Sequence, residues 1–212
     1  MIQIKTLVFN QFQVNTYILW DETGEALIID PGCVDAYEEK QLTDFIEFNH
    51  LKIVRLFNTH PHIDHIAGNK FVAEHFNIGL EIHKESMNIL KSVYGYAAAF
   101  GFPEVEVVEP SAYIEEGDLI SFGNSEMKVL YTPGHSDGSV CFYVEKDNLV
   151  IVGDVIFRES IGRADFPTGN IFNLKKNIRT KLFVLPDETV VYPGHGPSTT
   201  IGYEKKHNPF MS

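Results

Sequence analysis

A short segment before the first third of the chain ends constrains the fold and the chemistry more than any other feature. Positions 59–65 read Thr-His-Pro-His-Ile-Asp-His, directly after the apolar run 53–57, which predicts a buried strand. Imidazole and carboxylate groups suit zinc, iron or manganese. In an extended loop, His60 and His62 point to one side, and the aspartate and third histidine turn to a second point as a helix begins. The segment can therefore serve two adjacent metal ions.

Chance is the alternative explanation for this cluster, since a surface loop can carry a run of polar residues. Histidine is a rare residue here, with nine in the whole chain, and three of them fall within these seven positions. That clustering favours a metal-binding motif over a coincidental surface run.

Three further candidate ligands follow apolar runs later in the chain. His135 lies in Thr-Pro-Gly-His-Ser, Asp154 in Val-Gly-Asp and His195 in Pro-Gly-His-Gly, each at the predicted end of a strand. A neighbouring glycine lets backbone and metal approach closely. Taken alone, each residue is more often a loop residue whose hydrogen bonds the protein satisfies. Together with the first cluster, they predict a complete set of metal ligands.

The two halves of the chain show the same order of predicted elements. Strands are predicted at 2–9, 14–20, 25–29, 53–57, 118–122, 126–131, 139–145, 148–152 and 189–192. Asp35, with Glu38 three residues on, predicts the start of one helix, and Asn170 predicts the start of another. Strands followed by a helix in each half predict an α/β fold, an αββα four-layer sandwich. Residues 84–113 are hardest to interpret, because glycines and a proline interrupt an alanine-rich stretch.

Composition limits the organisation and the partners of the chain. No linker or repeat divides residues 1–212, so a single domain is expected. Seventeen basic and 29 acidic residues give a net charge of −12, which argues against nucleic acid as a partner. Cys33 and Cys141 lack metal-type spacing and are expected to be reduced, buried thiols. With no signal peptide and no membrane-length apolar run, a cytoplasmic protein without a membrane partner is expected.

The seven candidate ligands resemble those of the metallo-β-lactamase superfamily, whose His-x-His-x-Asp-His motif is followed by a distant His, Asp and His. The resemblance extends over nearly the whole chain and implies two divalent metal ions, zinc first, with iron or manganese as alternatives. It implies that one ion is held by His60, His62 and His135, the other by Asp64, His65 and His195, and that Asp154 bridges them. True β-lactamases usually carry a cysteine near the position of Asp154 and are exported, so antibiotic hydrolysis is not expected.

Finer features are similar to type II glyoxalases, and to their short, single-domain, hydroxyacylglutathione hydrolase-like branch. They are the segments 15–17 (Asn-Thr-Tyr), 30–32 (Asp-Pro-Gly), 153–166 and 194–210. The similarity implies a metallo-hydrolase that acts on small-molecule thioesters. A metal-bound hydroxide would attack the carbonyl, with Asp64 and Asp154 as the catalytic carboxylates that hold the metals, and a thiolate would leave. The chain ends soon after His195, without the helical region that grips glutathione, so a loose preference for the thiol half is expected.

The stretch Gly162 to Phe166 holds two weaker candidates. Asp165 could accept a hydrogen bond from a ligand imidazole and orient it, and Arg163 could meet a substrate carboxylate. A local Arg–Asp pair that only holds the loop is an equal alternative. The remaining histidines lie in no such context and are expected to be ordinary surface or partly buried residues: His50, His75, His83 and His207.

Three other functions remain open from the sequence. A persulfide dioxygenase, an oxidoreductase, would use one iron held by His60, His135 and Asp154. A nuclease of the same fold is disfavoured by the acidity. A non-catalytic metal-binding module would need closed coordination, whereas seven ligands shared by two metals leave room for water. The sequence leaves the oligomeric state and the natural thioester undetermined.

Overall fold

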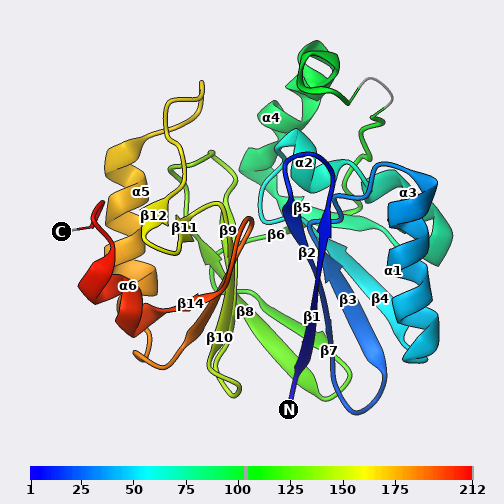
Figure 1. Ribbon diagram of the computed structural model, residues 1–212, viewed down its shortest axis with the longest axis horizontal. Helices are drawn as coiled ribbons and strands as arrows, with labels where there is room; N and C mark the ends of the chain where they lie inside the picture. The colour runs from blue at the N-terminus through cyan, green and yellow to red at the C-terminus, as the bar shows by residue number, and fades with distance from the viewer. Residues whose placement is uncertain (103–104, 212) are drawn as a thin grey trace.

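Two mixed β-sheets lie face to face in the computed structural model, which describes residues 1–102 and 105–211 (Figure 1). The first sheet has the order β1-β2-β3-β4-β5-β6, antiparallel from β1 to β3 and parallel from there on. Its strands are β1 (Gln3–Phe9), β2 (Val14–Trp20), β3 (Glu25–Ile29), β4 (Lys52–Phe57), β5 (Leu80–His83) and β6 (Ala112–Ile114). The parallel strands need crossover connections, and these contain the helices of the first half.

The second sheet has the order β14-β13-β10-β9-β8-β7, and only β10 and β13 in it run parallel among the described residues. Its strands are β7 (Leu119–Phe122), β8 (Ser125–Tyr131), β9 (Val140–Val144), β10 (Leu149–Gly153), β13 (Val190–Pro193) and β14 (Thr199–Thr200). A separate small hairpin of β11 (Ile156–Phe157) and β12 (Ser160–Ile161) follows β10. This hairpin carries the chain away from the sheet before the second helical region begins.

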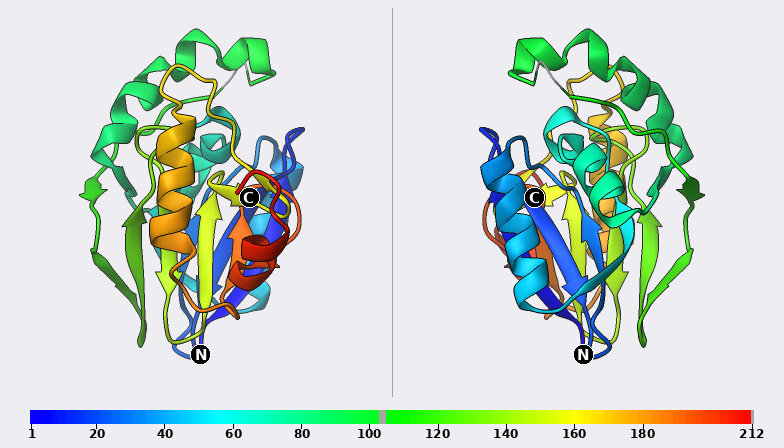
Figure 2. Two further views of the ribbon diagram at one scale, coloured as in Figure 1. Left: turned by 90° about the vertical axis from the view of Figure 1, so that its left-hand side faces the viewer. Right: turned by 90° about the vertical axis from the view of Figure 1, so that its right-hand side faces the viewer.

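Helices cover the outer face of each sheet, as the two side views in Figure 2 show. On the first sheet lie α1 (Ala36–Phe48), α2 (Ile63–Ile66), α3 (Asn69–Phe76) and α4 (Met87–Ser92), the last followed by short 3₁₀ turns at Val93–Gly95 and Ala97–Phe100. On the second sheet lie α5 (Ile171–Asn177), which continues as a π-helical turn Ile178–Leu182, and α6 (Ile201–His207). Within the described residues, no helix is both long and apolar enough to cross a membrane.

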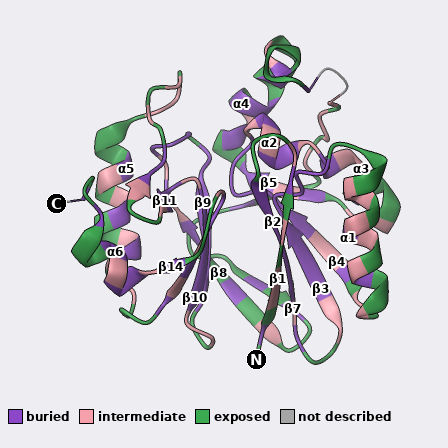
Figure 3. Ribbon diagram, viewed as in Figure 1, coloured by how far each residue is buried: buried purple, intermediate pink, exposed green. Residues whose placement is uncertain are grey.

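Three apolar layers result, and the alternation of side chains along each strand produces them. In β3, Ala26 and Ile28 pack toward the helices of the first half, whereas Leu27 and Ile29 pack between the sheets. Phe57 of β4 meets Phe142 of β9 across that central layer, with ring centroids 5.4 Å apart. Figure 3 shows the central strands, among them β2, β3, β9 and β10, almost wholly buried and the helices exposed on one side, as expected for sheets covered on both faces. The predicted αββα sandwich is confirmed.

The long strands with a clear alternating pattern were predicted correctly from the sequence, and the short elements were not. The predicted strands 14–20 and 25–29 match β2 and β3, and the side chain of Asp35 caps α1 by accepting from the N–H groups of Tyr37 and Glu38, both at 2.9 Å. The sequence analysis missed β5, β6, β11, β12, β14, α4 and α6. These strands span only two to four residues each, too few for an alternating pattern to stand out.

Candidate metal centre

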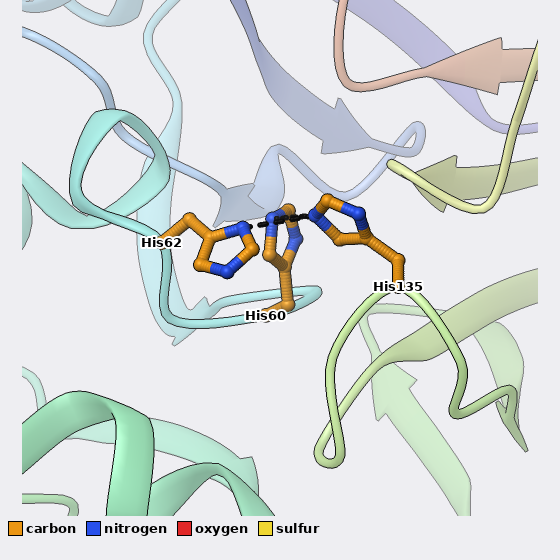
Figure 4. Close-up of side chains that lie close together, drawn as sticks. All are labelled: His60, His62 and His135. Atoms are coloured by element: carbon orange, nitrogen blue, oxygen red, sulfur yellow. Dashed lines mark hydrogen bonds between the residues drawn. The ribbon is translucent and has the colours of Figure 1, made fainter. Parts of the chain in front are cut away.

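Three imidazoles from two distant segments meet at one end of the sandwich. The loop after β4 carries His60 and His62, and the loop after β8 carries His135 (Figure 4). Nε2 of His135 lies 2.9 Å from Nδ1 of His62 and 3.2 Å from Nε2 of His60. Burial lowers the pKa of each ring, that of His62 to about 3. We call this group the three-imidazole pocket; its rings are neutral at pH 7, and each can offer a lone pair to a metal.

A second group combines one carboxylate with two imidazoles and lies beside the first. Oδ2 of Asp64 lies 3.1 Å from Nε2 of His195 and 3.6 Å from Nε2 of His65. Burial works to lower the pKa of both histidines, but the neighbouring carboxylates outweigh it and raise the pKa of each. We call this group the carboxylate pocket. A metal ion bound there would have to displace the imidazole protons.

Asp154, at the end of β10, lies between the two pockets. Its Oδ1 is 3.4 Å from Nε2 of His65 and 3.7 Å from Nε2 of His195, and its Oδ2 is 3.7 Å from Nε2 of His135. Burial works against ionisation, but the charge of His65 outweighs it and the pKa of Asp154 is lowered. A Cβ on Gly194 would come within 2.2 Å of Oδ1 of Asp154, so a residue without a side chain is required there.

Two buried atoms in this region show that the residues fit a cation. Among the buried side-chain atoms that the structure describes, Nε2 of His65 and Oδ1 of Asp154 have no hydrogen-bond partner, although they face each other. Leaving such a group unpaired costs about 1–3 kcal/mol. Five imidazoles and two carboxylates aimed at two adjacent points are a donor set that suits zinc, iron or manganese. The geometry therefore fits a pair of divalent metal ions.

Four of the five imidazoles are oriented by an acceptor at the nitrogen that faces away from the pockets. Such contacts set which ring nitrogen is free for a metal. The contacts are His60 Nδ1 with Thr59 Oγ1 at 3.0 Å, His65 Nδ1 with Asp30 Oδ2 at 2.9 Å, His135 Nδ1 with the Arg163 carbonyl at 2.7 Å, and His195 Nδ1 with the Phe12 carbonyl at 2.9 Å. The free nitrogen of each ring consequently points into a pocket.

Asp30 is a positioning residue that the sequence analysis did not single out. Besides His65, its carboxylate accepts from the N–H of Thr59 at 2.7 Å and from the Thr59 hydroxyl at 2.6 Å. Its backbone is left-handed, with φ at +53°, so that the carboxylate turns back under the loop after β4. A carboxylate at a predicted strand end, directly before Pro-Gly, was the signal available in the sequence.

The first sheet also holds the loop of the second sheet that carries His195. The side chain of Asn15 donates to the carbonyls of Pro193 and Gly196, both at 2.9 Å. The Tyr17 hydroxyl donates to the carbonyl of Pro193 at 2.6 Å. These bonds give the Asn-Thr-Tyr segment of β2 a physical role, because they fix the distance between ligands that belong to different sheets.

Of the two roles that the sequence leaves open for Asp165, the structure shows the local pair with Arg163. Both carboxylate oxygens of Asp165 pair with the Arg163 guanidinium, at 2.9 and 2.8 Å, on the exposed side of the loop. The loop turns the carbonyl of Arg163, and not the Asp165 carboxylate, toward His135. Arg163 still lies near the three-imidazole pocket, because its guanidinium covers the Phe166 ring at 4.5 Å and that ring lies 5.2 Å from His62.

Six of the seven predicted ligands fall into two potential metal-binding groups, His60 with His62 and His135, and Asp64 with His65 and His195, and a third group joins His60 and His65 to Asp30. The isolated histidines at 50, 75, 83 and 207 lie outside every such group in the described residues. The sequence model of the metallo-beta-lactamase superfamily matches residues 9–195. The chain belongs to the metallo-beta-lactamase superfamily. The resemblance seen in the sequence is thereby confirmed.

Within the superfamily, the chain is similar to the hydroxyacylglutathione hydrolase GloC of Haemophilus influenzae. The two are 34% identical over 215 residues, which cover 100% of this chain and 99% of the relative. This similarity supports the glyoxalase II-like branch of the superfamily.

Solved structures of the superfamily match the whole fold. The B3 metallo-beta-lactamase BLEG-1 superposes with a TM-score of 0.90 at 33% identity, covering 99% of this chain and 100% of that one. TTHA1623 in a di-iron-bound form gives 0.86 at 32% identity, covering 97% and 99%. ETHE1 from Myxococcus xanthus gives 0.78 at 29% identity, covering 98% and 83%. Proteins with different names therefore share this fold, and the function must be argued from the site.

Proposed function

We propose that this superfamily member is a thioesterase of the glyoxalase II type that works with two divalent metal ions. The observation that carries the proposal is the position of Asp154 between the three-imidazole pocket and the carboxylate pocket, with one oxygen turned toward each. The similarity to GloC supports a small-molecule thioester as substrate.

The proposed ligand sets follow the two pockets. His60, His62 and His135 would hold one ion, Asp64, His65 and His195 the other, and Asp154 both. Divalent ions held there would lower the pKa of a bound water toward neutrality and would polarise a carbonyl oxygen. Zinc is the first choice for this set, and iron and manganese are alternatives; the di-iron form of TTHA1623 makes iron a concrete candidate.

The chain's own groups would hold and orient the substrate. Arg163 is 66% exposed and lies beside the three-imidazole pocket, where its guanidinium can bind a carboxylate on the thiol half of a thioester. Asp165 would hold that guanidinium in place through its two hydrogen bonds. A thiolate is a good leaving group, so the reaction needs no strong acid at this position.

A persulfide dioxygenase with a single iron is the second candidate. The three side chains that it would use, His60, His135 and Asp154, lie close together, with His135 Nε2 at 3.2 Å from His60 Nε2 and 3.7 Å from an Asp154 oxygen. The similarity to ETHE1 fits this candidate. The carboxylate pocket counts against it, since one iron would leave Asp64, His65 and His195 without a metal ion to bind.

The deciding experiment measures metal content and two reactions on one preparation. Protein from cells supplied with zinc, iron and manganese is analysed for bound metal, then assayed for thiol release from acyl thioesters and for oxygen uptake with glutathione persulfide. We expect two metal equivalents, thiol release and no oxygen uptake. One equivalent of iron with oxygen uptake and no thiol release would overturn the proposal. A chromogenic β-lactam belongs in the same assay because of the similarity to BLEG-1, and we expect no hydrolysis of it.

A further inference from the structure

A buried carboxylate outside the two pockets lies in the last helix of the chain. Glu204 of α6 is fully buried and belongs to the tail segment 194–210, whose sequence resembles that of type II glyoxalases. Its Oε1 accepts from the Thr199 hydroxyl at 2.6 Å. Its Oε2 accepts from the side chain of Asn208 at 2.8 Å and from the backbone N–H of Glu159 at 3.0 Å. A carboxylate is costly to bury unless donors satisfy it, so these bonds fix Glu204 and its partners in place.

The same side chains tie α6 to the tip of the β11–β12 hairpin. Glu159 lies at that tip with a left-handed backbone, φ at +58°, which residues other than glycine seldom adopt. Its N–H donates to Glu204, and the Asn208 side chain donates to the carbonyl of Ser160 at 2.9 Å besides its bond to Glu204. The Tyr203 hydroxyl adds a bond to the Glu159 carboxylate at the surface. The last helix therefore holds the hairpin by its tip.

Both strands of this hairpin connect to the metal centre. The first strand follows directly after Asp154. The second leads through Gly162 to Arg163, whose carbonyl orients His135. A Cβ on Gly162 would overlap the backbone carbonyl of Asp154 and lie 3.1 Å from Nδ1 of His135, so the hairpin fits closely against both ligands. A displaced hairpin would consequently move Asp154 and the Arg163 carbonyl relative to each other.

The carboxylate pocket depends on the hairpin much less. Its imidazoles are oriented by Asp30 and by the Phe12 carbonyl, which belong to other segments. The hairpin contributes the Phe157 ring there, whose centroid lies 6.2 Å from that of the His195 ring, and a phenyl ring orients no ring nitrogen by a hydrogen bond. A loosened hairpin should therefore weaken mainly the three-imidazole pocket, whose His135 loses its acceptor.

We propose that Glu204 is a positioning residue of the metal centre. Acting through the β11–β12 hairpin, it holds Asp154 and the Arg163 carbonyl where the three-imidazole pocket needs them. This inference rests on the ligand sets of the proposed function. Removing the partner that orients a metal ligand typically costs roughly 10- to 100-fold in metal affinity, and Glu204 acts from farther out. We therefore expect a loss at the lower end, about tenfold, although every ligand is still present.

The experiment measures zinc affinity at each pocket separately, by competition with a chromogenic chelator. His195→Ala leaves the three-imidazole pocket intact, and His62→Ala leaves the carboxylate pocket intact. Glu204→Ala added to His195→Ala should lower the zinc affinity about tenfold. Added to His62→Ala, it should change the zinc affinity by about twofold at most, as expected for independent sites.

Glu204→Gln tests whether the hydrogen bonds to the hairpin carry the effect. The amide oxygen can still accept from the N–H of Glu159 and from Asn208, and the Thr199 hydroxyl can turn to accept from the amide nitrogen. We therefore expect Glu204→Gln to restore most of the zinc affinity that Glu204→Ala loses. Without such recovery, the hairpin bonds would not be the cause and the proposal would be wrong.

Two further variants separate positioning from stability. Thr200→Ala removes the side chain that caps α6 by accepting from the N–H of Tyr203 at 3.2 Å, so it should lower the Tm but keep the zinc affinity. Asn208→Ala keeps the test decisive if Glu204→Ala does not fold. It removes the bond to the Ser160 carbonyl and leaves Glu204 its other two donors, so a smaller loss is expected at the three-imidazole pocket alone.

The outcomes separate this inference from the proposed function. A loss of zinc affinity confined to the three-imidazole pocket and absent in Thr200→Ala supports the role of Glu204. Equal losses in both backgrounds, no loss in either, or a loss that Thr200→Ala reproduces would overturn that role while the proposed function stands. A native chain that binds one zinc ion, less tightly after Glu204→Ala, would overturn the two-metal function and support the role. A native chain that binds no divalent metal would remove both.

Discussion

Two buried aspartates at opposite ends of the sandwich differ in where their hydrogen bonds come from. Asp21 follows the end of β2, and its carboxylate accepts from Thr23, Asn124 and Ser125, at 2.6–3.0 Å, joining the β2–β3 turn to the β7–β8 turn. The start of β2, where Val14 pairs with His195, lies at the metal centre. There the side chain of Asp154 is 13% exposed, yet its Oδ1 is buried and has no hydrogen-bond partner in the described part of the chain.

This difference distinguishes two roles of a buried carboxylate, one in folding and one in metal binding. A carboxylate that the chain satisfies completely contributes to folding, because its donors would otherwise be left unpaired. A carboxylate that the chain leaves partly unsatisfied, among imidazoles whose free nitrogens face it, is prepared for a metal. Substitutions at the two ends should therefore separate activity from stability.

The largest effect is expected at Asp154. Asp154→Ala would remove the ligand shared by both pockets, so both metals should be lost and kcat/KM should fall by well over the roughly 100-fold typical of residues that only orient ligands. His195→Ala should cost less, since the three-imidazole pocket stays intact. Metal analysis and thioester turnover on both variants check this. Near-native turnover with full metal content in Asp154→Ala would show that the assignment is wrong.

A smaller effect on metal binding is expected at Asp30, which lies at the same end of the sandwich as Asp154. Asp30→Asn keeps the size of the side chain but weakens the bond that orients His65, so metal affinity should fall roughly 10- to 100-fold, mainly at the carboxylate pocket. Competition with a chromogenic chelator measures it. Asp21→Asn is the matched control. An equal loss of metal affinity in that variant would contradict the proposed difference between the two ends.

At the other end, the effect should appear in stability and not in turnover. Asp21→Ala leaves the N–H of Asn124 and the hydroxyl of Ser125 without their acceptor, which should lower the free energy of unfolding by about 2 kcal/mol. Urea unfolding gives this value, and kcat of the remaining folded enzyme should be unchanged. A variant of normal stability but reduced kcat would contradict the comparison.

The last expected effect is a pH dependence of that stability. The hydrogen bonds from Thr23, Asn124 and Ser125 outweigh burial and lower the pKa of Asp21 from 3.8 to about 2. A depressed pKa contributes stability above the unfolded value, and this contribution is lost as the pH falls from about 4 to 2. The difference in unfolding free energy between the native chain and Asp21→Asn should therefore shrink by roughly 2 kcal/mol over that range. A constant difference would show that the charge of Asp21 is not what matters.

The chain's local patterns determined the fold class and the candidate ligands. Long alternating runs such as 14–20 and 25–29 identified their strands because side chains alternate between two buried layers. The cluster at 59–65, together with His135, Asp154 and His195, marked the residues that converge, because each follows the end of a strand. Such features reside in a few consecutive residues and need no knowledge of packing.

Only the tertiary structure decided what surrounds those residues. Asp30 under His65, the Phe12 carbonyl behind His195 and the Arg163 carbonyl behind His135 are contacts between segments 28 to 183 positions apart. Two of these contacts use a backbone carbonyl, which every residue type possesses. No sequence pattern can therefore predict them. The direction of a carbonyl or a hydroxyl depends on how two sheets and their loops pack. For that reason the sequence could not separate the two roles considered for Asp165, and Asp30 was not singled out until the fold placed it under His65.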